Sequence, residues 1–280
     1  MQTLVLELVA FLILCAGAAL LFRVGGRRLL HFGTTATVCL LLATAGGWIG
    51  APFWWMAAPA SFAWTPAPLA FRLLAVAGIT FGAVGLAVLR HPTAAAIRLV
   101  LRMLAVYLVP LVAVLLVLHR DRLDWSAPIS WAFCAVAGGL ALGSAVALVR
   151  LVRLAPPGPG PSPQPGERLV WGLAAVLFGA WGVALYLTAQ GPVAAIWLWP
   201  QDALTSRLIG TMLLTLALVA LEARARADLG RLAALVFAVY GLGVAATVLL
   251  AAWSGRPLLW AYLLIPGLAG LGGVLRLIRR

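Results

Sequence analysis

Long apolar runs alternate with short polar breaks along the whole 280-residue chain. A helix needs about 20 apolar residues to cross a hydrocarbon core of roughly 30 Å, and most of these runs approach that length. The pattern predicts helices at residues 4–22, 30–50, 70–89, 98–118, 128–149, 168–189, 205–224, 231–253 and 257–276. We therefore expect an all-α polytopic membrane protein of about nine transmembrane helices.

The first and seventh runs need separate arguments. Arginines follow the first run and do not precede it, which reverses the charge order of a signal peptide, so we expect residues 4–22 to be a retained span. In the seventh run only residues 208–221 separate Arg207 from Glu222. We expect both charged side chains to snorkel outward so that this segment can span.

Arginine content differs between alternate breaks. One side carries fifteen arginines and the other carries five, which are Arg72, Arg120, Arg122, Arg207 and Arg256. The positive-inside rule places the arginine-rich side in the cytoplasm, and hence the N-terminus outside and the C-terminus inside. An odd number of spans follows. We expect a bacterial-type cytoplasmic (inner) membrane, with membrane lipids as the first partners.

Composition supports this class and excludes others. The chain is 64% hydrophobic and 10% charged, with a mean hydropathy of +1.09, which no water-soluble surface permits. The net charge of +13 is scattered singly between apolar runs, so we expect no nucleic-acid partner. All 20 basic residues are arginine, which excludes lysine Schiff bases and a Walker lysine. The cysteines Cys15, Cys39 and Cys134 have no paired spacing, and we expect no metal and no cofactor.

The chain also shows signs of an internal repeat. Residues 155–166 hold six prolines and cannot be helical, which predicts an extended cytoplasmic linker. A shift of 135 residues aligns several pairs, among them Trp64 with Trp199, Arg72 with Arg207, Thr80 with Thr215, and Trp125 with Trp260. We expect a leading helix (1–28), a four-helix repeat (29–154), the Pro-rich linker (155–167) and a second four-helix repeat (168–280). Two units of four spans are parallel repeats.

The repeated residues suggest a ligand site. Arg72 and Arg207 each follow a tryptophan, Trp64 or Trp199, by eight residues near the outer end of a span. Paired guanidinium donors there could bind a phosphate or carboxylate; alternatively, the arginines snorkel to headgroups or to Asp202. Thr80 and Thr215 lie near mid-span. Their hydroxyls could line a cavity, but a bond to the carbonyl one turn earlier is the commoner arrangement.

Other polar and small residues have simpler interpretations. Glu222 is placed to pair with Arg226, and Asp228 with Arg224 and Arg231, at helical spacing. The pairs Gly78/Gly82 and Gly139/Gly143 have the GxxxG spacing of close helix contacts. No aspartate or glutamate falls near the middle of an expected span, which disfavours ion-coupled transport.

Three functions remain open. The first is a non-enzymatic permease-like or binding protein for an amphipathic anion or lipid, with an outward-facing cleft between the repeats that is lined by the repeated Arg, Trp and Thr residues. The second is a structural or accessory subunit of a larger membrane complex, with protein partners in the membrane. The third is an enzyme that uses the outer loop from His119 to Asp124 on a lipid-linked substrate.

Overall fold

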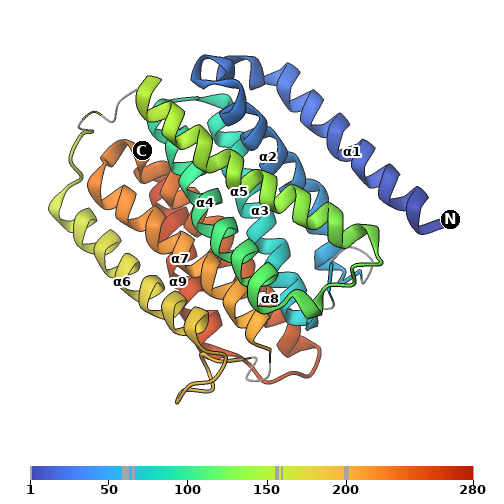
Figure 1. Ribbon diagram of the computed structural model, residues 1–280. Coiled ribbons are helices and arrows are strands. Elements are labelled where there is room, and N and C mark those ends of the chain that lie inside the picture. Colours follow the sequence, from blue (N-terminus) through green and yellow to red (C-terminus); the bar gives the residue numbers. More distant parts are fainter. Residues whose placement is uncertain are drawn as a thin grey trace.

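The computed structural model describes residues 2–58, 63–64, 67–154, 158, 160–198 and 202–279, with side chains from Leu12 onward. These ranges are largely helical and contain no strand (Figure 1). Their long helices are α1 (Gln2–Val24), α2 (Thr34–Trp55), α3 (Pro68–Arg90), α4 (Ala94–Leu118), α5 (Pro128–Leu154), α6 (Pro165–Leu187), α7 (Ala203–Ala225), α8 (Gly230–Trp253) and α9 (Trp260–Ile278). Short 3-10 segments are η1 (Gly26–Phe32), η3 (Arg120–Arg122) and η4 (Ala227–Leu229).

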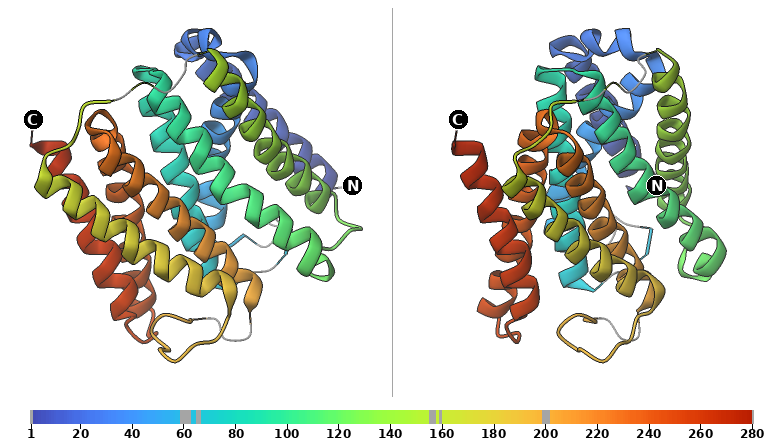
Figure 2. Two further views of the ribbon diagram at one scale, coloured as in Figure 1. Left: turned by 60° about the vertical axis from the view of Figure 1, so that its left-hand side comes forward. Right: turned by 90° about the vertical axis from the view of Figure 1, so that its left-hand side faces the viewer.

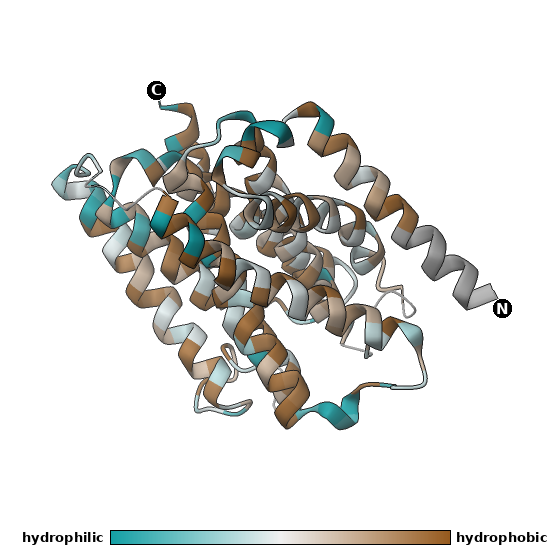
Figure 3. Ribbon diagram, turned by 45° about the horizontal axis from the view of Figure 1, so that its top comes forward, coloured by the Kyte–Doolittle hydropathy of each residue, from teal (hydrophilic) through white to brown (hydrophobic). Residues whose placement is uncertain are grey.

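The helices fit a membrane. Within the described residues, α2 to α9 are eight helices that are long and apolar enough to cross a bilayer. Only residues 12–24 of α1 have described side chains, and this apolar stretch is shorter than a span. The protein is thus a multi-pass helical membrane protein, and the count of nine spans stays a prediction. Figure 3 shows hydrophobic residues along the helices and hydrophilic residues gathered toward their ends.

Several helix boundaries differ from the sequence prediction, among them both ends of α2 and the start of α6. The chain is not α-helical over residues 30–33 but turns through η1 and Gly33. From Thr34, α2 runs past Pro52 to Trp55, because a membrane helix tolerates an internal proline. The Pro-rich linker was expected to be non-helical up to residue 166, yet α6 begins at Pro165. Proline fits the first helical position, where its missing N–H has no partner to lose.

Sequential helices pack as hairpins, and several contacts join the hairpins, including α3–α8, α4–α7 and α2–α5. α2 packs on α3, α4 on α5, α6 on α7 and α8 on α9, while α3 contacts α8 and α4 contacts α7. As a result α3 and α7 are the most buried spans. α1 lies at the edge of the bundle and contacts α2, η1 and α5 (Figures 1 and 2).

Several of these contacts have the symmetry that a parallel repeat would produce, although the α2–α5 contact has no α6–α9 counterpart of similar extent among the described residues. Exchanging α2–α5 with α6–α9 turns the α3–α8 contact into the α7–α4 contact, and the α2–α3 hairpin into the α6–α7 hairpin. Both of these hairpins have a glycine at a close contact of their helices, and these glycines, Gly47 and Gly182, are 135 residues apart. A Cβ on Gly47 would lie 2.2 Å from the Gly78 carbonyl oxygen, and one on Gly182 would lie 2.9 Å from that of Gly210. These features support the repeat, which remains a prediction.

The two GxxxG pairs differ in the structure. Gly78 lies at the close contact of α3 with Gly47, as helix packing requires. Gly143 faces the Cys39 sulfur, whereas a Cβ on Gly139 would meet no described atom within 4 Å. Close helix approach at Gly139 was therefore a wrong expectation.

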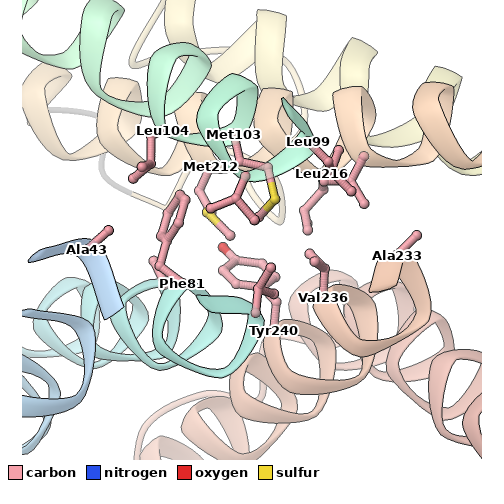
Figure 4. Close-up of a cluster of buried hydrophobic side chains, with 14 of the residues drawn as sticks. Ala43, Phe81, Leu99, Met103, Leu104, Met212, Leu216, Ala233, Val236 and Tyr240 are labelled. Carbon is pink, nitrogen blue, oxygen red and sulfur yellow. The ribbon is translucent and has the colours of Figure 1, made fainter. Parts of the chain in front are cut away.

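The core lies where α3, α4, α7 and α8 meet. Figure 4 shows Phe81, Met103, Met212 and Tyr240 converging there from these four helices. Buried aliphatic side chains such as Leu99 and Val236 extend the cluster. On the outside, large apolar side chains of α5, α6 and α9 are more than half exposed, as a lipid-facing surface requires: Leu142, Leu173, Val176, Leu268 and Ile278.

The acidic residues near the arginine-rich end take other partners than expected. Glu222 of α7 pairs with Arg102 of α4 and not with Arg226. Asp228 pairs with Arg226 at 2.8 Å and not with Arg224 or Arg231, which were its expected partners. Arg226 also donates to the Gly158 carbonyl of the linker at 2.8 Å. The prediction from helical spacing was wrong for Glu222 because Arg102, on the neighbouring helix α4, lies closer to it than Arg226 does.

Candidate functional site

The repeated arginines occupy matching positions near the arginine-poor end of the bundle. Arg72 is the fifth residue of α3 and Arg207 is the fifth residue of α7. α3 begins at Pro68, a favourable first helical residue, and α7 begins after Asp202, whose carboxylate accepts from the Thr205 N–H at 3.2 Å. Each arginine borders a contact between the two halves, α3 with α8 or α7 with α4.

Arg207 is held by protein groups. Its Nε donates to the Tyr186 carbonyl oxygen at 3.2 Å, and its Nη1 lies 2.7 Å from Nε2 of His119. A guanidinium can only donate, so Nε2 accepts and the imidazole is neutral with its proton on Nδ1. Arg207 thus contacts His119 and Tyr186 and not Asp202, and its contact with lipid headgroups stays a prediction. Glu222 likewise pairs within the protein, with Arg102, and the snorkelling of both charged side chains stays a prediction.

His119 is in an environment that favours its neutral form. The residue caps the C-terminus of α4 and is partly buried. Burial lowers the pKa of its imidazole, and the positive charges of Arg207 and Arg122 lower it further, while Asp121 and Asp202 act in the opposite direction. The space around Arg207 is lined by Leu111, Val114, Tyr186, Leu204, Leu208 and Thr211 and has no room for a water molecule.

Arg72 has a different environment. A cavity of about 110 Å³ opens beside it, lined by Pro68, Leu69, Arg72, Ala251, Ser254 and Arg256. We call it the Arg72 pocket. The Nε of Arg72 is buried and has no hydrogen-bond partner among the described residues. Arg256 is exposed, and in the described part of the chain neither arginine forms an ion pair. The pocket therefore presents two cations and no carboxylate.

A helix cap positions Arg256. α8 ends at Trp253, and Gly255 follows in the left-handed conformation with φ of 82°. The Gly255 N–H donates to the Ala252 carbonyl at 3.0 Å and the Arg256 N–H to the Ala251 carbonyl at 3.1 Å. These are the two bonds of a Schellman motif, in which glycine is strongly favoured. The motif turns the chain so that Arg256 lines the same pocket as Arg72.

Of the other residues of the predicted site, Trp64, Thr80 and Thr215 do not line the Arg72 pocket. Trp64 is partly buried and packs edge-on against Phe133 with ring centroids 5.4 Å apart, while Trp199 lies outside the described residues. The fully buried hydroxyls of Thr80 and Thr215 donate to the carbonyls of Val76 and Thr211, each at 2.8 Å. This is the commoner arrangement that the sequence suggested, and neither threonine lines a pocket of either arginine.

The structure does not place Arg72 and Arg207 in one cleft. They line two pockets that share no residue. Ser254, which lines the pocket with Arg72, and His119, which contacts Arg207, are themselves 135 positions apart. Alignment of the two halves did not identify Ser254, Arg256 and His119 as neighbours of the repeated arginines. Each of them lies in the half opposite to the arginine that it accompanies. The same offset, applied together with the α3–α8 and α4–α7 contacts, would have found Ser254 and His119.

In the loop from His119 to Asp124, which was considered for acid–base chemistry, the Asp124 carboxylate accepts hydrogen bonds within a local turn. Asp124 accepts from the Ser126 hydroxyl at 2.6 Å and from its N–H at 3.0 Å, and these bonds lower the pKa of the carboxyl group. A general acid at neutral pH needs a raised pKa, so Asp124 is poorly suited to that role. Within the described residues, no group of three His, Cys, Asp or Glu side chains could hold a metal ion.

No family model, curated protein or solved structure matches the chain. The geometry and charge of the two arginine environments are therefore the basis for the functional argument.

Proposed function

We propose that this is a non-enzymatic membrane protein that binds the headgroup of an anionic amphiphile in the Arg72 pocket, at the outer face of a cytoplasmic (inner) membrane. The observation that carries the proposal is that Arg72, whose buried Nε has no hydrogen-bond partner among the described residues, lines an open cavity of about 110 Å³ together with Arg256. Buried polar atoms without a partner are rare in proteins, so an anion that accepts from Nε after a small rotation of the Arg72 side chain would complete the site.

The pocket suits an oxyanion. Guanidinium groups donate planar, paired hydrogen bonds to phosphate and carboxylate oxygens, and these charge-assisted bonds are about twice as strong as neutral ones. Two arginines on one pocket repel each other unless an anion lies between them. The cavity exceeds the volume of one water molecule, roughly 30 Å³, several times, so a phosphate group has room.

The surroundings favour an amphiphile. Trp253, beside Ser254 at the end of α8, is 92% exposed, and Leu249 and Leu250 one turn earlier are also exposed. An aromatic ring at a helix end is typical of the membrane interface, where lipid headgroups lie. A lipid could therefore place its phosphate in the Arg72 pocket while its chains stay on the apolar surface of α8.

Binding explains the structure better than transport does. The pocket has room only for a headgroup, and α3 and α8 otherwise pack closely, since a Cβ on Gly243 of α8 would lie 2.6 Å from the Val76 side chain of α3. A permease would need a second arrangement of these helices. We therefore propose lipid binding ahead of permeation.

The test measures lipid binding to the purified protein in zwitterionic nanodiscs. We expect Arg72→Gln/Arg256→Gln to bind phosphatidylglycerol at least about tenfold more weakly than the unaltered protein, because each charge-assisted bond contributes about 1.5–3 kcal/mol. Arg122→Gln is the matched control, since it removes an exposed arginine from the same end. Equal affinities in all three proteins would refute the proposal. Inorganic phosphate forms a second arm: if it binds and the lipid does not, the ligand is a free oxyanion.

A further inference from the structure

Arg207 lies in a closed counterpart of the Arg72 pocket. Each arginine is the fifth residue of its helix, and each faces the end of a helix from the other half. The end of α8 presents Ser254 to a pocket with room for an anion. The end of α4 presents His119, whose Nε2 accepts from Nη1 of Arg207, and the space that Arg207 lines has no room for a water molecule.

One proton would change this arrangement. The lone pair on Nε2 of His119 now accepts from Arg207. A proton from the outer solution that binds Nε2 removes this acceptor and places an imidazolium beside a guanidinium. The two cations then repel, while the Nε of Arg207 stays bonded to the Tyr186 carbonyl. An oxyanion between them would accept from both cations and offset their repulsion.

We propose that Arg207 and His119 form a second, proton-linked oxyanion site, which opens when His119 takes up a proton and releases Arg207. The site rests on these two residues alone, so it does not depend on the Arg72 pocket. Because the anion interacts more strongly with the protonated imidazole, anion binding and proton uptake favour each other.

The groups around His119 permit this change. Arg207 and Arg122 oppose a positive charge on the imidazole, and Asp121 and Asp202 favour it. Asp202 is committed to the α7 cap through Thr205, and Asp121 is exposed. His119 is followed by the exposed 3-10 turn Arg120–Arg122, and the last residues of α4, Val117 and Leu118, are exposed as well. The end of α4 therefore has few packed side chains that would prevent a small movement of the His119 ring.

The experiment uses the full chain carrying Arg72→Gln/Arg256→Gln, so that the first pocket is disabled. Sulfate is the probe, because its charge is constant over the range in which histidine titrates. Calorimetry at about pH 8 and about pH 5, in buffers of different ionisation enthalpy, gives affinity and proton uptake together. We expect affinity to rise by up to about tenfold per pH unit as pH falls, with uptake of about one proton per sulfate.

Variants identify the groups responsible. His119→Ser places a serine at the end of α4, as Ser254 stands at the end of α8. We expect this variant to bind sulfate with no pH dependence. Arg207→Gln should bind no sulfate at either pH, whereas Arg122→Gln should keep the pH dependence. Competition by phosphatidylglycerol would identify a lipid headgroup as the occupant, and its absence a soluble oxyanion.

Two results would overturn the proposal. One is sulfate affinity in the Arg72→Gln/Arg256→Gln protein that is unchanged between the two pH values. The other is a pH-dependent affinity that persists in His119→Ser. Loss of lipid binding at Arg72 leaves these outcomes unaffected, so the two sites are judged separately.

Discussion

Arg102 of α4 and Glu222 of α7 form an ion pair between the two predicted repeats, near the arginine-rich end of the bundle. Both side chains are partly buried, so removal of one leaves a charge with poor solvation. We expect Glu222→Gln to lower the free energy of unfolding by about 1–3 kcal/mol, because the pair is less exposed than a surface salt bridge. A double-mutant cycle with Arg102→Gln, measured by denaturation in detergent, gives the pair energy, and Arg153→Gln is the exposed control. Additive effects in the cycle would contradict a specific pair.

The close contact of α2 with α3 predicts a sharp difference between two glycine substitutions. A Cβ at Gly47 would lie 2.2 Å from the Gly78 carbonyl oxygen, so Gly47→Ala must push the helices apart. We expect a loss of about 1–3 kcal/mol or more. Gly139→Ala adds a Cβ that meets no described atom within 4 Å, and should be neutral or stabilising by up to about 1 kcal/mol. Thermal unfolding of both variants in detergent measures this, and equal midpoints would refute the contact.

The environment of His119 predicts that acid destabilises the protein. The pKa of the imidazole is lowered in the folded state by burial and by Arg207, so the unfolded chain binds the proton more readily. The stabilisation is present above the ordinary pKa of about 6.5 and is lost as pH falls through the lowered value. His119→Asn should reduce this decline. Denaturation midpoints at a series of pH values check it, and an identical slope in the variant would exclude His119 as the cause.

The Schellman motif at the end of α8 predicts an indirect effect on the Arg72 pocket. Gly255 has a φ of 82°, which costs a residue with a Cβ roughly 1 kcal/mol. We expect Gly255→Ala to displace Arg256 and weaken phosphatidylglycerol binding severalfold, although no side chain that lines the pocket is removed. Gly272→Ala, where a Cβ would meet no described atom within 4 Å, should leave lipid binding unchanged. Unaltered binding in Gly255→Ala would show that Arg256 needs no fixed position.

The distribution of arginines predicts the orientation of the chain. With native cysteines replaced, Gln190→Cys between α6 and α7 should react in intact cells with a membrane-impermeant maleimide, whereas Gln164→Cys in the linker should react only after permeabilisation. The reason is that positively charged loops are retained in the cytoplasm. The reverse labelling pattern would invert the orientation and place the Arg72 pocket inside.

The sequence predicted the eight long apolar helices α2 to α9 well, because their hydrophobic length is visible in the sequence. The boundaries at Trp55 and Pro165 were missed, since proline was interpreted as a helix breaker at positions where membrane helices accept it. The pairing of Glu222 was missed for another reason. Spacing along one helix cannot show that α4 brings Arg102 closer than Arg226.

The candidate site was predicted in part. Comparison of the two halves found Arg72 and Arg207, and the structure gives them matching positions near one end of the bundle. The comparison of the two halves did not show that Arg72 and Arg207 lie in separate pockets. That separation depends on which helix of the other half packs against each arginine. Arg256 was visible only as a loop arginine, and its role depends on a cap formed by Gly255.

The most direct test of the central claim is a high-resolution density map of the protein in nanodiscs that contain phosphatidylglycerol. The proposed function predicts phosphate density between Arg72 and Arg256, within about 3 Å of the Arg72 Nε. A pocket filled only by water, or an Arg72 Nε bonded to a protein carbonyl or carboxylate, would contradict it.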